Sequence, residues 1–146
     1  MKLPLLLGAL LLSASPALAD DFVYLKCESN HIVTVKDLVS NQTIKREENA
    51  VIQYLKIDLL NSRIMGSLGG EWEGVEIVNG YVVEDKEEIV NGITVLQKAS
   101  MQFDPAGKIV ADMLIRRDSL SELESGKIRG ICKGSDESAF EEALNQ

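Results

Sequence analysis

Apolar and polar residues alternate at every second position through much of the chain after residue 50, which is the period of a half-buried β-strand. The longest run covers residues 93–103, and residues 51–60 and 108–116 alternate in the same way. One side of the longest run carries Ile93, Val95, Gln97, Ala99, Met101 and Phe103. The pattern predicts strands that turn one face toward a core.

Tight turns separate these strands. Asn79-Gly80 and Asn91-Gly92 are Asn-Gly pairs, the strongest short signal for a two-residue hairpin, because both central residues of a type I′ turn need positive φ. Asp104-Pro105-Ala106-Gly107 has the composition of a type I turn. The strands are therefore expected to follow one another as antiparallel hairpins.

Other stretches are less regular. Residues 22–27 and 31–36 are rich in β-formers and are expected to be two strands separated by a turn at residues 28–30. Residues 37–50 are polar and predict a long connection. Residues 71–78 alternate only if a bulge at Gly74 places Trp72, Val75 and Ile77 on one face. Residues 118–125 suit either one helical turn or a cover over the barrel end.

Eight or nine strands joined by tight turns form a meander, and a meander of this length tends to close so that no edge is left open. We predict an all-β fold, a small antiparallel meander closing into a lipocalin-like barrel, with a two-sheet sandwich as the alternative. Residues 135–146 predict a short helix with Phe140, Ala143 and Leu144 on one side. We expect this helix to dock on the outside of the barrel, over Val110 and Leu114.

The first 19 residues have the plan of a signal peptide. Lys2 is followed by an apolar run from Leu3 to Leu12, and Ala17-Leu18-Ala19 is a small-x-small cleavage pattern. The run is shorter than the roughly 20 residues that span a bilayer. We expect an exported protein, periplasmic or secreted and soluble after cleavage near Ala19, with one barrel domain over residues 20–134.

The chain has two cysteines, Cys27 and Cys132. An even number of cysteines in an exported chain favours a disulfide, and two cysteines allow only one pairing. A bond between Cys27 in the first strand and Cys132 in the last would connect the two ends of the fold. No CxxC redox motif occurs, which favours a structural role.

The composition is acidic, with 23 Asp and Glu against 15 Lys and Arg, a formal net charge of −8. Removing Lys2 with the predicted leader, which contains no acidic residue, gives −9. Such a surface repels nucleic acid and anionic membranes but permits a basic protein partner. Solubility alone is the simpler explanation of the charge.

Motifs of catalysis are absent from the sequence. His31 is the only histidine, which excludes a histidine-rich metal centre, and no G-x-S-x-G, dinucleotide-binding or P-loop pattern occurs. A carboxylate-based hydrolase would need a pair of acids across a cleft. The acids at Glu84, Asp85, Glu87 and Glu88 are instead expected on a solvated hairpin. We therefore expect no catalytic residues, no metal and no cofactor.

Three residues are candidates for ligand binding. Trp72, the only tryptophan, could contact a sugar ring or a lipid, although a core plug is the commoner role for a lone tryptophan. Gln53 and Gln97 interrupt rows that are otherwise apolar, and a buried amide needs a hydrogen-bond partner. That partner could be a ligand, the other glutamine or water.

An exported β-barrel bracketed by cysteines, with an R-x-x-x-L segment at Arg116–Leu120 and a G-x-C ending at Gly130–Cys132, looks like many small bacterial periplasmic proteins. In size and plan it resembles the c-type lysozyme inhibitors. The inhibitory loop motif of that family is not found, so no site residue is carried over. The sequence predicts a monomeric, non-enzymatic binding module for a small apolar ligand or a basic protein. A lysozyme-inhibitor-like periplasmic protein, a structural envelope protein and a carboxylate-based hydrolase are the alternatives.

Overall fold

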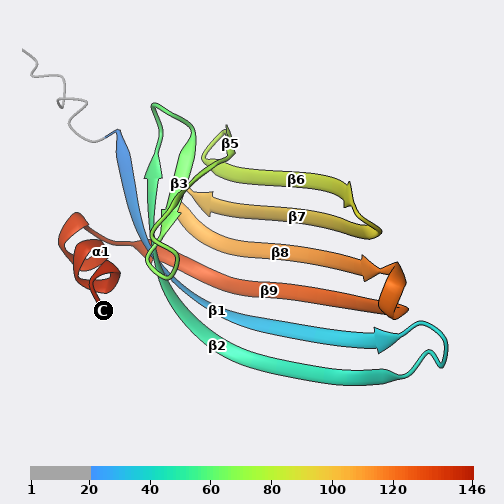
Figure 1. The fold of residues 1–146 in the computed structure, drawn as a ribbon. Helices are drawn as coiled ribbons and strands as arrows, with labels where there is room; N and C mark the ends of the chain where they lie inside the picture. Colours follow the sequence, from blue (N-terminus) through green and yellow to red (C-terminus); the bar gives the residue numbers. More distant parts are fainter. Residues whose placement is uncertain (1–20) are drawn as a thin grey trace, which may run out of the picture.

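The computed structural model describes residues 21–146, so the predicted leader over residues 1–19 lies outside the described residues. The described chain forms nine strands, one 3₁₀ turn and one α-helix (Figure 1). The strands are β1 (Phe22–Asp37), β2 (Thr43–Asp58), β3 (Arg63–Gly66), β4 (Trp72–Gly74), β5 (Glu76–Val78), β6 (Tyr81–Val90), β7 (Ile93–Phe103), β8 (Ala106–Arg117) and β9 (Glu122–Gly134). The helix α1 spans Glu137–Leu144. None of the helical residues among 21–146 belongs to a segment long and apolar enough to cross a membrane.

All nine strands belong to one antiparallel sheet with the order β4-β3-β2-β1-β9-β8-β7-β6-β5. Two series of hairpins, β1 to β4 and β5 to β9, are joined by the pairing of β1 with β9. The two outer strands, β4 and β5, are separated in the chain only by Val75, whose N–H donates to the Ser62 carbonyl at 2.9 Å. The sheet is therefore a nearly closed barrel, and the predicted meander is confirmed.

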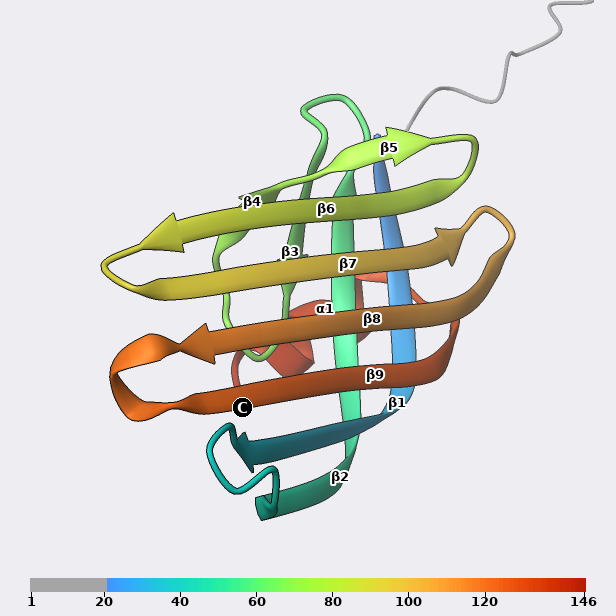
Figure 2. The same ribbon diagram turned by 90° about the vertical axis from the view of Figure 1, so that its right-hand side faces the viewer.

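The barrel is closed only at one end. β3 pairs with residues 55–58 of β2, and β5 pairs with residues 81–83 of β6, so the remainder of β2 and β6 has no outer neighbour. At the closed end β1, β2 and β3 cross β6 to β9 at a steep angle (Figure 2). At the other end the six long strands continue as an open, curved sheet that finishes in three hairpin tips (Figure 1).

Two predictions for residues 22–50 are wrong. Residues 28–30 do not turn but lie inside β1, a strand of 16 residues, and residues 43–50 belong to β2 rather than to a connection. β1 is paired along nearly its whole length on both sides, so the ladder overrides local turn propensity. Residues 43–50 are exposed, which explains why no hydrophobic alternation marks them.

The core lies at the closed end and is built around the disulfide. Cys27 and Cys132 form the predicted bond, which is confirmed, and both are 1% exposed. The other buried members of this cluster are Leu25, Leu55, Ile57, Val82, Met101 and Phe103. Both Asn-Gly hairpin turns also occur as expected, with positive φ at Asn79, Gly80, Asn91 and Gly92.

Residues 71–78 form two strands, not one bulged strand. β4 ends at Gly74 and β5 begins at Glu76, and Val75 and Ile77 pack against the core. Trp72 does not share their face as predicted. Glu73 lies opposite Ile64 and faces inward with it, so its neighbour Trp72 points outward, where its ring is half-buried.

The predicted tail helix is present and docked. Asp136 caps it by accepting the Ala139 N–H at 2.8 Å, and Phe140 is only 1% exposed. The predicted position over Val110 and Leu114 is wrong. The chain leaves β9 beside β1, with the Ser135 N–H bonded to the Tyr24 carbonyl at 2.8 Å, which brings Phe140 against Tyr24 at the closed end.

Residues 118–125 match the expected helical turn only over their first three residues, and residues 122–125 belong to a strand that was not expected. Asp118–Leu120 form a single 3₁₀ turn, and Ser121 takes a left-handed conformation with φ of 51°. β9 then begins at Glu122, so the segment is a hairpin tip between β8 and β9.

Candidate functional site

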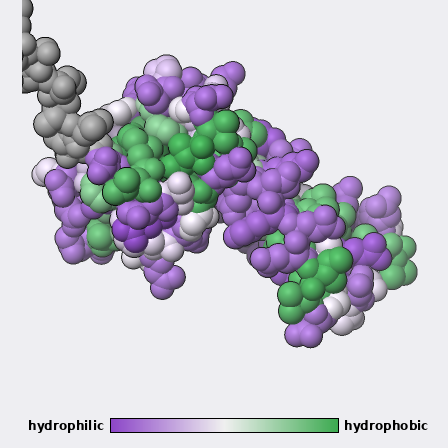
Figure 3. Space-filling view, turned by 90° about the horizontal axis from the view of Figure 1, so that it is seen from above, coloured by the Kyte–Doolittle hydropathy of each residue, from purple (hydrophilic) through white to green (hydrophobic). Residues whose placement is uncertain are grey.

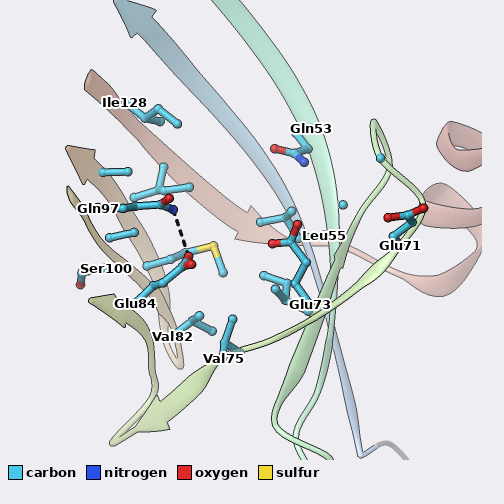
Figure 4. Close-up of a pocket in the computed structure, with 17 residues that line it drawn as sticks. Gln53, Leu55, Glu71, Glu73, Val75, Val82, Glu84, Gln97, Ser100 and Ile128 are labelled. Carbon is cyan, nitrogen blue, oxygen red and sulfur yellow. Dashed lines mark hydrogen bonds between the residues drawn. The ribbon is translucent and has the colours of Figure 1, made fainter. Parts of the chain in front are cut away.

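A cavity of about 350 Å³ opens on the concave side of the sheet, inside the closed end (Figure 4). Most of its wall is aliphatic. The apolar lining residues are Leu55, Ile64, Val75, Val82, Met101, Ile109 and Ile128. The lining residues come from β2, β3, β4 and β6 to β9, and from the segments that join β3, β4 and β5. The cavity therefore forms only where the barrel is closed.

Small residues create this space. Ala99 and Ala111 lie directly opposite each other on β7 and β8, and both line the cavity. Gly66 lies on β3 opposite Leu55, and a Cβ atom at Gly66 would collide with the side-chain amide of Gln53. Larger side chains at these positions would fill the concave surface. The volume is at the lower end of the range of small-molecule sites.

The polar groups of the cavity include two glutamine amides on opposite walls. Gln97, on β7, donates from Nε2 to Oε2 of Glu84 on β6 at 3.2 Å. Gln53 lies across the cavity on β2 (Figure 4). Within residues 21–146 no protein group accepts from or donates to the Gln53 side chain, so its amide is available to a bound molecule.

The charged groups of the lining are three carboxylates. Glu84 projects from β6, and Glu73 projects from β4 toward the cavity from the other side, while Glu71 lies farther out (Figure 4). Glu84 also forms an ion pair with Lys86 at 3.1 Å, and its side chain is 20% exposed. The lining itself contains no cationic residue.

Nearby carboxylates at this edge of the cavity raise the pKa of Lys86. Its hydrogen bond to Glu84 raises the pKa of Lys86 above its ordinary value, and the charges of Glu84, Glu88 and Glu73 raise it further. Lys86 itself is exposed and lies outside the lining. A cation that enters the cavity meets the carboxylates of Glu73 and Glu84 on two sides, although Glu84 is already paired with the Lys86 ammonium.

Two of the three predicted binding residues line this cavity, and the third does not. Gln53 and Gln97 face each other across it. Trp72 lies on the outer surface, with its ring stacked on Phe22 at a centroid distance of 6.4 Å and the Arg63 guanidinium 4.3 Å from the ring centroid. Trp72 therefore contacts Phe22 of β1 and Arg63 of β3 on the outer surface and does not line the cavity.

Sequence reasoning missed Glu73 and Glu84. Glu84 was expected on a solvated hairpin, but it shares a face with Val82, two residues earlier, which is buried. The pattern predicts Glu73 on the face opposite Trp72, Val75 and Ile77. In the structure Glu73 is paired with Ile64 and faces inward with it. The sequence does contain a signal for Glu84. Residues two apart on a strand share a face, so Glu84 lies on the same side of β6 as the apolar Val82.

The ring of His31 hydrogen-bonds to a serine of its own strand. Its ring Nε2 lies 3.0 Å from the Ser29 hydroxyl, and both residues belong to β1. Among residues 21–146 there is no group of three or more histidine, cysteine, aspartate or glutamate side chains that could hold a metal ion. The arrangement around the cavity is suited to binding by shape and charge.

Comparison of the chain with protein-family models, with curated proteins and with solved structures finds no match.

Proposed function

We propose that this protein is a non-enzymatic binding module whose cavity takes a small ligand with an apolar body and a cationic group. The observation that carries the proposal is the pairing of aliphatic walls with Glu73 and Glu84 in a space of about 350 Å³. The apolar body would contact Leu55, Met101 and Ile109. The cation would lie between the two carboxylates near the mouth.

The two kinds of wall make different contributions. Burying aliphatic surface stabilises the complex by about 25 cal/mol per Å² of area removed from water. A cation about 4 Å from a carboxylate gains about 1–4 kcal/mol, depending on how much water screens the pair. The charge therefore selects the ligand class, and the aliphatic walls supply most of the affinity.

The glutamines would orient the polar end of the ligand. Gln97 holds Glu84 in place through its 3.2 Å hydrogen bond. The amide of Gln53 can donate to or accept from the ligand on the opposite wall. This division of roles supports a ligand with one polar end and not two.

A pair of probes that differ only in charge tests the proposal. A medium-chain alkylamine should bind to the full protein, as measured by isothermal titration calorimetry, whereas the alkanoate of the same length should bind at least tenfold more weakly. Glu73→Gln and Glu84→Gln should each weaken amine binding by roughly tenfold, since each removes one charge contact. Glu48→Gln, on the outer face of β2, is the matched control and should bind like wild type.

Filling the cavity provides a second, independent measurement. Ala99→Leu should abolish amine binding while the β-sheet circular dichroism is retained. Ala50→Leu, an exposed position on β2, makes the same chemical change outside the cavity. Equal binding of amine and alkanoate, or unchanged binding in Ala99→Leu, would contradict the proposed function.

A basic protein is the second candidate ligand, and one observation favours it. Asp85, Glu87 and Glu88 are exposed on β6, which has no outer neighbour at these residues. A partner could insert one lysine or arginine side chain between Glu73 and Glu84. Inhibition of a c-type lysozyme that is lost in the Glu73→Gln, Glu84→Gln double variant would support this candidate.

We also propose that the protein functions in an oxidising compartment outside the cytoplasm. The Cys27–Cys132 disulfide supports this location, because such bonds persist where thiols are not kept reduced. Mass spectrometry of the protein from its host should find an N-terminus near Asp20 and no free thiol. An intact Met1 or two free thiols would argue against export.

A further inference from the structure

Two strands of the sheet have an outer edge that no other strand covers. β2 pairs with β3 only through residues 55–58, and β6 pairs with β5 only through Tyr81, Val82 and Val83. In the part of the chain that the structure describes, residues 45–53 of β2 and 84–90 of β6 therefore have a strand neighbour on one side only. They form the two opposite borders of the open sheet (Figure 1). An unpaired edge is a template for a further strand.

The paired end of each strand shows which backbone groups the open edge presents. The Tyr54 N–H donates to the Ser67 hydroxyl at 3.1 Å, and the Tyr54 carbonyl accepts the Ser67 N–H at 2.8 Å, so the backbone of Tyr54 faces outward from β2. Arg46 is an even number of residues away on the same regular ladder and faces the same way. On β6 the backbone of Tyr81 faces β5 across a two-residue turn, so that of Glu87 also faces outward.

The two edges carry related charge patterns. Residues 45–48 of β2 are Lys-Arg-Glu-Glu, residues 85–88 of β6 are Asp-Lys-Glu-Glu, and all of them are exposed. Figure 3 looks down on the β6 side of the molecule, where hydrophilic surface is prominent. The six long strands from β2 to β6 alternate in direction. A second copy placed beside β2 in the same orientation therefore presents its β6 edge antiparallel to β2.

Charge selects one register of this pairing, in which Arg46 lies opposite Glu87 of the second copy. Both residues lie on the convex face, since Gln53 on β2 and Glu84 on β6 line the concave cavity, so the two copies continue one curved sheet. Three pairs in this register join opposite charges and one joins like charges, whereas a shift of two residues in either direction creates two like-charge pairs. The pairs of the selected register are Lys45–Glu88, Arg46–Glu87, Glu47–Lys86, Glu48–Asp85 and Asn49–Glu84.

The same register supplies counter-charges that the single chain lacks. Glu87 and Glu88 form no ion pair among residues 21–146, although both are exposed on the strand that carries Lys86, which pairs with Glu84 at 3.1 Å. In the selected register each of these two acids meets a cation on the β2 edge of the other copy. Opposite charges directly across two antiparallel strands stabilise the pairing.

We propose that the β2 edge of one copy pairs with the β6 edge of the next, so that copies join head to tail in a continuous antiparallel sheet. Pairing of β2 with β2 would leave the β6 edge uncovered, and pairing of β6 with β6 would bring its acids together. A head-to-tail contact leaves a free edge at each end, so it leads to species larger than a dimer. The assembly does not require a ligand in the cavity.

Charge reversal on each edge tests the pairing. The weight-average mass of the protein, with the same verified N-terminus in every variant, should rise past that of a dimer over a concentration series in analytical ultracentrifugation. Arg46→Glu and Glu87→Arg should each weaken association at least tenfold, because each turns an attractive cross-strand pair into a repulsive one. An equal mixture of the two variants should associate again, since the altered β2 edge of one then meets the altered β6 edge of the other.

Matched controls make the same changes of charge elsewhere. Lys133→Glu and Glu142→Arg alter exposed residues away from both edges and should associate like wild type. A protein that stays monomeric at every concentration, a mass that levels off at a dimer, or a mixture of Arg46→Glu with Glu87→Arg that does not associate would each overturn the proposal. Equal losses in the edge variants and the controls would overturn it as well.

Cross-linking tests the register and leaves the three opposite-charge pairs in place. Asn49 and Glu84 of two copies would form a non-hydrogen-bonded pair with Cα atoms about 4.5 Å apart, a separation that a disulfide can bridge. A mixture of Asn49→Cys with Glu84→Cys should therefore give a disulfide-linked dimer on oxidation, and a mixture of Asn49→Cys with Glu88→Cys should not. A dimer that forms as readily from Asn49→Cys alone would overturn the proposal, because β2 would then pair with β2.

Discussion

Cys27 and Cys132 lie directly opposite each other on β1 and β9, with their Cα atoms 4.0 Å apart. The bond closes a loop with a sequence separation of 105 residues, because the chain visits every other strand between these two. The pairing of β1 with β9 also joins the two series of hairpins. The disulfide therefore stabilises the one contact on which the order of the sheet depends.

Removing this bond should lower the stability of the protein substantially. The chain-entropy model gives about 4–5 kcal/mol for a loop of this length, an upper value if the unfolded chain retains structure. The Cys27→Ser, Cys132→Ser variant should therefore unfold at a clearly lower urea concentration, measured by circular dichroism. Wild-type protein treated with reductant is the control, and its free energy of unfolding should fall by a similar amount. A fall below about 1 kcal/mol in both samples would contradict the prediction.

Docking of α1 should depend on one side chain. Phe140 is 1% exposed and packs against Tyr24 with a ring-centroid distance of 6.1 Å. Phe140→Ala should cost about 3–5 kcal/mol, the range for a buried aromatic residue truncated to alanine. Glu142→Ala, on the exposed side of the helix, should cost less than about 0.5 kcal/mol.

Removing the whole helix tests the same contact in another way. A chain that stops after Lys133 should keep its β-sheet circular dichroism, melt at least as far below wild type as Phe140→Ala does, and bind more of a hydrophobic dye. Unchanged melting and dye binding would mean that α1 does not stabilise the barrel in solution.

Trp72 should contribute less to stability than a core tryptophan and nothing to the cavity. Its stacking on Phe22 and its contact with Arg63 lie on the outer surface. Trp72→Ala should cost about 2 kcal/mol, below the 3–5 kcal/mol of a fully buried aromatic residue. Binding of an alkylamine should be unchanged; a tenfold loss of binding would return Trp72 to the list of ligand contacts.

Local patterns in the sequence were enough to predict the hairpins between β5 and β9. Asn79-Gly80 and Asn91-Gly92 fix turn positions by their need for positive φ, and the alternation over β7 fixes which residues face inward. The row containing Gln97 therefore pointed to the cavity. The position of α1 was not predictable in this way, because it depends on where β9 ends relative to β1.

Residues without burial were the ones predicted worst. The first half of β2 is exposed on both faces, so nothing in its composition separates a strand from a loop. Glu73 depends on a register that only the pairing with β3 sets, since a shift of one residue exchanges it with Trp72. Glu73 could therefore be placed in the cavity only with the structure, whereas the alternation of residues already put Gln53 and Gln97 on inward faces.

Asp58 should make stability depend on pH in the acid range. Its side chain is buried at the end of β2, and its carboxylate accepts the Asn61 Nδ2 at 2.8 Å and the Arg63 Nε at 2.7 Å. The hydrogen bond from the Asn61 side chain, with a further contribution from Arg63, holds the pKa of Asp58 below its ordinary value. A lowered pKa means that the folded state favours the charged form.

The sign of the effect follows from this direction. An unfolded aspartate has a pKa of about 3.9, so the stabilisation is fully present above that pH and is lost as the pH falls through the lower value of the folded state. Asp58→Asn should therefore lower the melting temperature at neutral pH. The difference from wild type should shrink as the pH falls below about 4.

Thermal melts from neutral pH to about pH 2.5 would check this. Asp85→Asn is the control, because Asp85 is exposed and its nearest cation, Lys98, is 4.0 Å away. This variant should melt like wild type at neutral pH. A difference between Asp58→Asn and wild type that stays constant over the whole range would show that the charge of Asp58 does not stabilise the fold.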